Sequence, residues 1–430
     1  MTPIHIKAHI KGKQVPNGKV VISGAKNSAT CLLAAALISD EEVKLANFPC
    51  FLVDALHQID FIRQSGGIIK LDTLNECLSI DSTQYRIRPL LNFDFPIRIT
   101  YLLAAGMLKR SKIAKIPYPG GCRIGARGYD LHIMVWERFG ADVKELGDCL
   151  QIQAPNGLKP GIIDFPFLTV GGTENALITA SIIEGTTTIR NPYITPEINE
   201  LILFLRSMGI IIVVYKNNEI KVTGKSFIKG ASFSIMPDRI EALTWLVFSV
   251  ISGGSVHIEN VPFSSMEIPL LHLKHIGIDY LSNNDSILIL PKRISSNNLR
   301  PFEVACGTHP GIISDMQPLF TLLALGINGL SFVHDYRYPE RVKYCEQLEK
   351  FYPNCLRWNP GRIEIRGGIT PQASDVESTD LRGSIVLGLA ALLAEGESTV
   401  EHFEMALRGY NNFQDKLAKL GINIDYENLI

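Results

Sequence analysis

NSATCLLAAALISDEEVKLANFP, residues 27–49, contains the pattern that decides the fold. Its first half is a run of Ala, Leu and Ile with almost no polar face, and its second half alternates polar and apolar residues around KLANF. A helix at a protein surface has a single apolar stripe, so a helix that is apolar on nearly every side is expected to be buried. The stretch therefore predicts a buried helix followed by a strand on the outside of the molecule.

The same pattern occurs six times along the chain. The apolar, helix-like runs begin near residues 27, 98, 174, 239, 315 and 381. In five copies a second amphipathic helix ends at a glycine before another strand, as in KLGINIDY (419–426), whereas EKFYPNCLRW (349–358) lacks that glycine. A period of roughly 70 residues is longer than that of solenoid repeats. We therefore predict an α/β protein of six similar units, grouped three and three, with buried helices and outer sheets.

The bulk composition is typical of a soluble, globular, cytoplasmic protein. The 430 residues are 46% hydrophobic and 20% charged, with a formal net charge of −1 and a mean hydropathy of +0.14. A nearly neutral chain has no general attraction to nucleic acid or to an anionic membrane. The N-terminus lacks an apolar signal segment, and no apolar run reaches the roughly 18 residues that a membrane span needs. Eight cysteines without CxxC pairs or Cys/His clusters indicate reduced thiols, no metal site and no cofactor.

Cys122 has the most unusual local context of these cysteines. It lies in PYPGGCRIGARGYDLH (117–132), directly after paired glycines and close to Arg123 and Arg127. Glycines make a thiol accessible, and arginines stabilise a thiolate or attract an anionic ligand. The local residues therefore favour a reactive thiol, and a glycine turn with an incidental exposed thiol is the alternative.

Basic residues recur where the repeats begin. Lys26 and Asn27 lie in ISGAKNSA before the first buried helix, Arg98 and Arg382 hold similar positions, and Arg408 lies in ALRGY. A single basic residue at a helix start is usually a surface charge or the partner of a nearby acid. Several at equivalent positions predict one site for phosphate or carboxylate at converging helix N-termini. For the first pair, a solvated lysine beside a capping asparagine is the alternative.

Asp315 lies in PGIISDMQPLF (310–320), ahead of another buried helix. An N-cap is the common role of an aspartate in such a position, and a base or orienting group directed at the same anion site is the alternative. Asp238 and Asp380 have the same context, and we interpret both as helix caps.

Seven motifs together resemble the enolpyruvyl transferase family, in order and over almost the whole chain. They are SGAKNSA, PGGCRIGARGYDLH, DFPFLTVGGTEN, PDRIEALTWL, SDMQPLF, DLRGS and LRGY. The resemblance implies a two-domain inside-out α/β barrel with three βαβαββ repeats per domain. It further implies a discontinuous domain of residues 1–24 plus 237–430, and a second domain of residues 25–236 that carries the Cys122 loop as a lid. The active site is expected in the cleft between these domains.

The resemblance also implies a reaction. The enolpyruvyl group of phosphoenolpyruvate would be transferred to the 3-hydroxyl of UDP-N-acetylglucosamine by addition and then elimination of phosphate, the first committed step of peptidoglycan synthesis. Cys122 would deliver a proton to the methylene carbon, and Asp315 would orient or deprotonate the acceptor hydroxyl. Fosfomycin, an epoxide that mimics phosphoenolpyruvate, would alkylate Cys122.

The remaining site residues are also carried over from the resemblance. Phosphoenolpyruvate has both a phosphate and a carboxylate, which accounts for cations at Lys26, Arg127 and Arg408, with Arg382 as a further cation. The positions that match contacts to the sugar nucleotide are Asn27, Arg98, Arg127, Asp130 and Leu131.

Several positions differ from the usual motifs of the family. They are Leu52, Gly128, Thr195, Tyr338 and Leu407. The phosphoenolpyruvate positions are retained, and much of the change falls on the acceptor side or behind the site. Two alternatives therefore stay open: an enolpyruvyl transferase that acts on another nucleotide, such as uridine monophosphate, and a non-catalytic protein that binds a sugar nucleotide.

Overall fold

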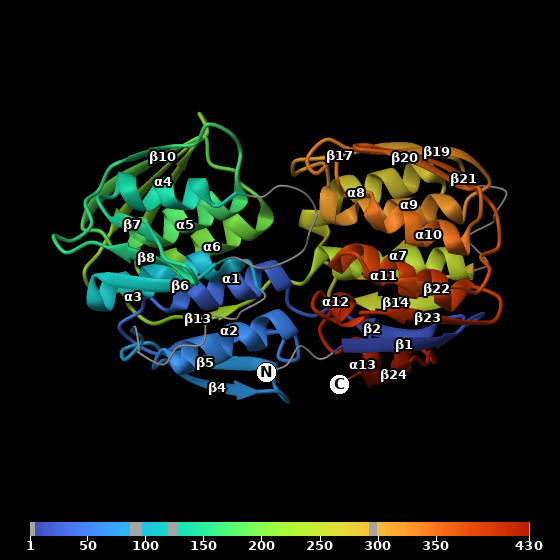
Figure 1. Cartoon of the computed structure of the whole chain (residues 1–430), viewed down its shortest axis with the longest axis horizontal. Helices are drawn as coiled ribbons and strands as arrows, with labels where there is room; N and C mark the ends of the chain where they lie inside the picture. The colour runs from blue at the N-terminus through green and yellow to red at the C-terminus, as the bar shows by residue number, and fades with distance from the viewer. Residues whose placement is uncertain (1–4, 87–96, 119–127, 292–298, 430) are drawn as a thin grey trace. The chain divides into compact units, whose positions relative to one another are not determined.

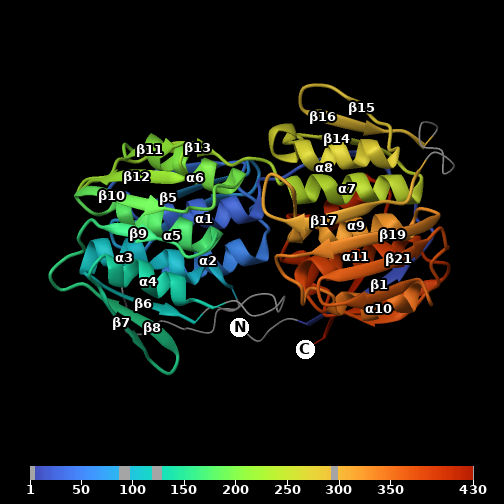
Figure 2. The ribbon, with the colours of Figure 1, turned by 90° about the horizontal axis from the view of Figure 1, so that it is seen from above.

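The computed structural model describes residues 5–86, 97–118, 128–291 and 299–429, and the chain divides into two compact units (Figures 1 and 2). Within those ranges the terminal unit consists of residues 5–23 and 237–429, and the middle unit of the described residues between 24 and 236. Each unit contains three sheets among its described residues.

One repeat of the middle unit shows the building plan in chain order. Its elements are β9 (Ile162–Asp164), α5 (Val170–Ser181), β10 (Gly185–Arg190), α6 (Pro196–Ser207), β11 (Ile211–Tyr215) and β12 (Glu219–Gly224). β9 and β10 pair in parallel, whereas β12 pairs antiparallel with both β10 and β11. The sheet order β11-β12-β10-β9 therefore results from a βαβαββ sequence.

The other two repeats of the middle unit follow the same plan. One contains α1 (Lys26–Ala36), β3 (Val43–Ala46), α2 (Val53–Gln64), β4 (Ile68–Asp72) and β5 (Cys77–Asp81), and its first strand is the distant β13 (Ser232–Ser234). The other contains η1 (Ile99–Leu103), α3 (Ala104–Ser111), β6 (Ile113–Pro117), α4 (Asp130–Arg138), β7 (Asp142–Glu145) and β8 (Cys149–Gln153).

The terminal unit contains three more repeats. The first comprises β2 (Asn17–Val21), α7 (Arg239–Ser252), β14 (Ser255–Glu259), α8 (Phe263–Ile276), β15 (Leu281–Ser282) and β16 (Ser286–Ile289). The second comprises β17 (Glu303–Gly307), β18 (Ile312–Ile313), η3 (Ser314–Met316), α9 (Gln317–Leu325), β19 (Gly329–Asp335), α10 (Lys343–Phe351), β20 (Leu356–Asn359) and β21 (Arg362–Gly367). The third comprises β22 (Asp375–Glu377), α11 (Leu381–Leu393), β23 (Glu397–Glu401), α12 (Glu404–Leu407), α13 (Phe413–Lys419), β24 (Asp425–Leu429) and the N-terminal β1 (His5–Lys11).

The first helix of each repeat is the buried one, as the sequence predicts. In α11 every residue from Leu381 to Leu392 is buried, and α9 is buried over its whole length and packs against α7 and α11. The strands alternate buried and more exposed residues, as in β14 and β23. The predicted α/β fold of six repeats with buried helices and outer sheets is confirmed. Within the described ranges, no helix is both long enough and apolar enough to cross a membrane.

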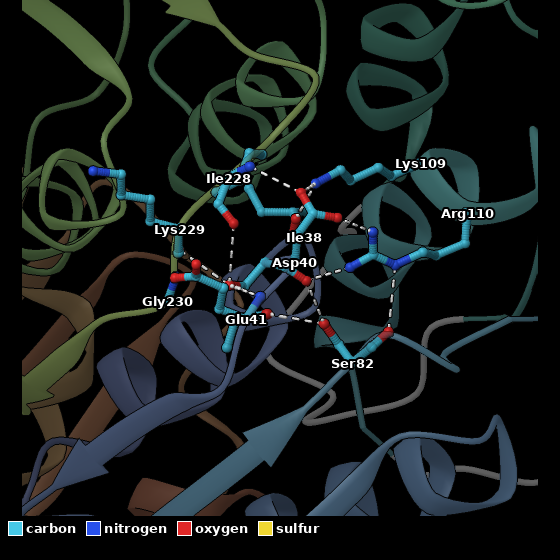
Figure 3. Close-up of polar contacts among 11 residues, drawn as sticks. Ile38, Asp40, Glu41, Ser82, Lys109, Arg110, Ile228, Lys229 and Gly230 are labelled. Carbon is cyan, nitrogen blue, oxygen red and sulfur yellow. Dashed lines mark hydrogen bonds and ion pairs between the residues drawn. The ribbon is translucent and has the colours of Figure 1, made fainter.

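A partly buried polar network joins the carboxyl ends of α1 and α3 in the middle unit (Figure 3). The Asp40 carboxylate accepts hydrogen bonds from Lys109, from Arg110 and, at 2.8 Å, from the backbone N–H of Ile228. Lys109 Nζ also donates to the carbonyl of Ile38 at 2.7 Å. The network satisfies a backbone carbonyl in the turn that follows α1, and it connects three separate segments of the chain.

Candidate active site

Lys26 is the first residue of α1 and lies against an acidic partner. Its Nζ is 2.9 Å from Oδ2 of Asp54 in the first turn of α2, and the two side chains are 17% and 7% exposed. Asn27 is exposed, and the N-cap of α1 is Ala25, which offers no side-chain hydrogen bond. The alternative of a solvated lysine beside a capping asparagine is therefore wrong. The sequence analysis missed Asp54, although a carboxylate in the first turn of the next helix was a usable signal.

Arg98 precedes the 3-10 helix η1, so the predicted buried helix of this repeat begins with a 3-10 turn. Its Nη2 donates to the Gly128 carbonyl at 2.8 Å, and its guanidinium carbon lies 5.9 Å from the ring centre of Tyr101. A Cβ at Gly128 would lie 2.5 Å from Oδ1 of Asp130 and would force one of them to move. The exposed Asp130 side chain could rotate away, so packing alone does not explain the glycine at this position, which is one of the departures from the family motifs.

The two residues of α4 that are predicted to contact the sugar nucleotide, Asp130 and Leu131, differ in exposure. Asp130 begins α4 and is exposed, whereas Leu131 is 9% exposed and belongs to the core of the middle unit. His132, which the sequence analysis did not single out, stacks on Tyr101 with ring centroids 3.8 Å apart and an interplanar angle of 18°. Burial lowers the pKa of His132 to about 3, with the Arg98 guanidinium adding to the effect. This imidazole is consequently neutral and structural.

In the terminal unit, Asp315 lies in the 3-10 turn η3 just before α9. It is the N-cap residue of neither η3 nor α9, so the capping interpretation is wrong. Its Oδ1 accepts a hydrogen bond from Arg341 Nη1 at 2.7 Å, and its Oδ2 lies 3.4 Å from Arg382 Nε. The arginine side chains are each 3% exposed and the aspartate side chain is 28% exposed. Two buried guanidinium groups thus stabilise a carboxylate that remains partly open.

Neighbouring residues hold this arrangement in place. Arg341 Nη1 also donates to Ser314 Oγ at 3.2 Å, and its Nη2 lies 3.5 Å from Oδ1 of Asp380. Asp380 caps α11 by accepting from the backbone N–H groups of Arg382 and Gly383, at 3.1 and 3.3 Å. The interpretation of Asp380 as a helix cap is therefore confirmed.

Asp238 is likewise confirmed as a helix cap. Its carboxylate accepts from the backbone N–H groups of Ile240 and Glu241 at the start of α7, at 2.7 and 3.2 Å. Both capping aspartates therefore neutralise helix N-termini, which leaves Asp315 as the aspartate of the three that caps no helix.

The two remaining predicted arginines differ in position. Arg382 is in the first turn of α11, with its guanidinium carbon 5.6 Å from the ring centre of Tyr410. Burial is the largest single influence and lowers the pKa of Arg382, but Asp315, Tyr410 and Asp238 together outweigh it, so the pKa of Arg382 is raised. Arg408 is the C-cap of α12 and is partly exposed. The prediction that it lies at a helix N-terminus is therefore wrong.

Three candidate residues of the glycine-rich stretch lie outside the described residues. They are Cys122, Arg123 and Arg127. Their roles stay predictions from the sequence.

The residues of each unit have their own chemical capacity. A lysine and an arginine in the middle unit offer N–H donors to anionic oxygens. In the terminal unit, a carboxylate with fixed orientation can accept a hydrogen bond or a proton from a hydroxyl group.

Comparisons with known proteins agree with the fold. The model of the EPSP synthase (3-phosphoshikimate 1-carboxyvinyltransferase) family matches residues 10–417. The chain is 33% identical over 411 residues to a UDP-N-acetylglucosamine 1-carboxyvinyltransferase of Helicobacter hepaticus, covering 95% of this chain and 96% of that protein. It is also 33% identical over 416 residues to UDP-N-acetylglucosamine 1-carboxyvinyltransferase 2 of Listeria monocytogenes, covering 96% of each.

Solved structures show the same fold at lower identity. The enolpyruvyl transferase NikO from Streptomyces tendae superposes with a TM-score of 0.87 at 23% identity, covering 100% of both chains. EPSP synthase from Acinetobacter baumannii superposes with a TM-score of 0.72 at 16% identity, covering 98% of this chain and 100% of that one.

Proposed function

The chain belongs to the EPSP synthase family of carboxyvinyltransferases, and we propose that it transfers the enolpyruvyl group of phosphoenolpyruvate to the 3-hydroxyl of UDP-N-acetylglucosamine, releasing phosphate. The names of the curated relatives support this acceptor. The observation that carries the proposal is the Asp315 carboxylate, held by Arg341 at 2.7 Å and Arg382 at 3.4 Å. It is a base with fixed orientation in the part of the chain that sequence motifs assign to catalysis.

The proposed reaction has two steps. In the first, the acceptor hydroxyl gives its proton toward Asp315 as its oxygen bonds to C2 of phosphoenolpyruvate, while Cys122 protonates the methylene carbon C3. In the second, the tetrahedral adduct loses a proton from C3 and the C2–O bond to phosphate breaks, which restores the double bond. Arg341 and Arg382 favour the ionised form of Asp315 and fix its orientation. The same charges lower its basicity, so the carboxylate first accepts a hydrogen bond from the hydroxyl group and takes its proton only as the new C–O bond forms.

Binding of the anionic substrate is proposed for the cations of both units. Lys26, Arg127, Arg382 and Arg408 would neutralise the phosphate and carboxylate of phosphoenolpyruvate. The sugar nucleotide would be contacted by Asn27, Arg98, Arg127, Asp130 and Leu131. Variants at these positions test each proposed contact separately.

Two departures from the family motifs have structural explanations that do not involve the acceptor. Thr195 caps α6 by accepting from the backbone N–H of Ile198 at 3.3 Å. Leu52 is 1% exposed and belongs to the core of the middle unit. Neither residue therefore argues for a different acceptor. We place the reaction at the first committed step of peptidoglycan synthesis, in the cytoplasm, where the free cysteines of the described residues would stay reduced.

Phosphate release from phosphoenolpyruvate tests the proposal. The assay compares UDP-N-acetylglucosamine with uridine monophosphate as acceptor, in the wild type and in Lys26→Gln and Asp315→Asn variants. We expect turnover with UDP-N-acetylglucosamine that is lost in both variants. Turnover only with uridine monophosphate would reassign the acceptor. No turnover with either, together with calorimetric binding of UDP-N-acetylglucosamine, would indicate a non-catalytic binding protein.

A further inference from the structure

Three potential metal ligands meet at one end of the sheet β22-β23-β1-β24 in the terminal unit, where β1 and β23 lie side by side (Figure 1). His5 begins β1, His402 follows β23, and Glu404 begins α12. His5 Nδ1 lies 3.1 Å from His402 Nδ1. Glu404 Oε1 is 3.5 Å from the first of these nitrogens and 3.4 Å from the second. The three donor atoms therefore form a nearly equilateral triangle.

This triangle has the size of one face of a tetrahedral zinc site. Donors bound to Zn²⁺ at about 2.0 to 2.1 Å with tetrahedral angles lie about 3.3 Å from one another. The observed separations of 3.1, 3.4 and 3.5 Å bracket that value. Two imidazoles and one carboxylate are also a donor set that zinc and related divalent metals prefer. The side chains are 24% to 45% exposed, so an ion can reach them from solvent.

An internal comparison shows that the fold itself does not require a histidine at 402. His402 has a φ of 56° directly after the second strand of its repeat, and three other repeats have an asparagine with a positive φ at that position. Those asparagines each donate from Nδ2 to the carbonyl that follows the first strand of their repeat, in the pairs Asn47–Ile235, Asn191–Phe165 and Asn260–Ile22, at 2.8 to 2.9 Å. In the repeat that contains β1, β22 and β23, His402 instead directs Nδ1 at His5 and Glu404.

The groups around the three ligands are arranged as metal ligands usually are. The other carboxylate oxygen of Glu404 accepts from the backbone N–H of Ile6 at 2.8 Å, which directs Oε1 toward the imidazoles. Glu377 Oε1 lies 3.8 Å from His402 Nε2. At this distance the carboxylate attracts the far side of the imidazole electrostatically but does not hydrogen-bond to it. Two carboxylates beside the imidazoles make the site attractive to a cation.

We propose that His5, His402 and Glu404 bind a divalent transition metal, with zinc as the best fit and water completing the coordination. The ion would link the N-terminal strand β1 to α12, whose C-cap is Arg408, and Arg408 N–H donates to the Glu404 carbonyl at 3.1 Å. Metal binding would therefore stabilise the segment that carries this arginine. The expectation of no metal rested on local spacing, which could not reveal a site whose histidines are 397 positions apart.

Titration of the metal-free full chain with Zn²⁺ at pH 7.5 tests the proposal, with Co²⁺ absorption as a report of coordination geometry. The variants are His402→Asn, which copies the residue of the three other repeats, and Glu404→Gln. The control is His9→Ala, because His9 lies on the same strand and pairs only with exposed Glu427 among the described contacts, at 3.0 Å.

We expect one Zn²⁺ per wild-type chain, a tetrahedral Co²⁺ spectrum, a rise in melting temperature with zinc, and at least tenfold weaker binding in both variants. The control should bind like the wild type. Equal zinc binding by the wild type and a folded His402→Asn variant would overturn the proposal, as would loss of binding in the His9→Ala control. Should Glu404→Gln not fold, the asparagine variant decides the question alone.

Discussion

Arg341 donates to Asp315 across a separation of 26 positions, with Nη1 and Oδ1 2.7 Å apart. The arginine side chain is 3% exposed and the aspartate side chain is 28% exposed. Arg341 also contacts Ser314 and Asp380, so its guanidinium group is fixed in place. It therefore orients the Asp315 carboxylate while leaving that carboxylate partly exposed to solvent. Arg341 is thus a positioning residue for the proposed base.

Replacing that arginine should reduce turnover more than substrate affinity. Arg341→Met removes one of the two guanidinium partners that the described residues give Asp315. We expect kcat to fall about 10- to 100-fold, less than the roughly 10²- to 10⁴-fold expected for loss of the base itself. Steady-state kinetics should show KM changing less than kcat. Arg341→Lys should recover part of the loss, and a purely structural role would be indicated if kcat followed the folded fraction in every variant.

The pair of Lys26 and Asp54 predicts a second kinetic effect. Lys26→Gln removes the cation that we propose for phosphoenolpyruvate binding, so kcat/KM for that substrate should fall by about 100-fold or more, as expected for a charge-assisted contact of about 3 kcal/mol. Lys44→Gln is the matched control, because Lys44 is exposed and its nearest carboxylate oxygen, on Glu42, is 3.7 Å away. Equal effects of the two substitutions would contradict a specific role for Lys26.

Two buried carboxyl groups of the middle unit make its stability depend on pH. Burial raises the pKa of Glu174 and of Glu200 to about 7, from an ordinary value of 4.5. Between these values the folded state binds more protons than the unfolded state, so the free energy of unfolding falls as pH rises and levels off above about 7. Each carboxyl group contributes about 3 kcal/mol at most to this change.

Urea unfolding at pH 5 and pH 8 measures that dependence. Glu200→Gln should reduce the difference between the two pH values, because glutamine does not titrate. Glu42→Gln, at an exposed position, should leave it unchanged. A pH dependence that is the same in Glu200→Gln as in the wild type would show that Glu200 ionises normally.

The network in Figure 3 gives a prediction about stability alone. Asp40→Ala leaves Lys109 and Arg110, which are 9% and 14% exposed, without their carboxylate, and should cost about 3 to 5 kcal/mol of unfolding free energy. Asp142→Ala removes an exposed carboxylate paired with Lys144 at 3.4 Å and should cost less than about 1 kcal/mol. Similar losses in both variants, measured by urea unfolding, would mean that the partly buried network adds little.

Fosfomycin should modify a single cysteine. Burial raises the pKa of Cys31 and Cys306, and that of Cys345 to about 12, so these thiols are poor nucleophiles. Cys122 is expected to react instead, because of its glycines and arginines. Intact-mass measurement should find one adduct in the wild type and none in Cys122→Ser; an adduct that persists in the variant would refute the assignment.

Most of the fold could be predicted because a fully buried helix has apolar residues on every side, and this pattern is visible in the sequence. The run from Cys31 to Ala36 has no polar face, and it is fully buried. The pairing of strands that are distant in the sequence could not be predicted in this way. β13 pairs with β3, and β2 pairs with β14, through backbone hydrogen bonds that almost any residues in a strand can make.

The candidate site was only partly predictable for a similar reason. Lys26, Arg382 and Asp315 lie at helix starts, where local position limits their roles. Their partners Asp54 and Arg341 come from other elements, and only the tertiary fold brings them together. Asp315 shows the limit most clearly, because a helix cap and a carboxylate clamped by two arginines have the same local sequence.

Phosphate release from phosphoenolpyruvate in the presence of UDP-N-acetylglucosamine, for the wild type and Asp315→Asn side by side, tests the central claim most directly. The account predicts turnover in the wild type and a loss of about 10²-fold or more in the variant, with folding unchanged. Turnover that persists at the wild-type rate in Asp315→Asn would contradict the assignment of the carboxylate clamped by Arg341 and Arg382 as the base.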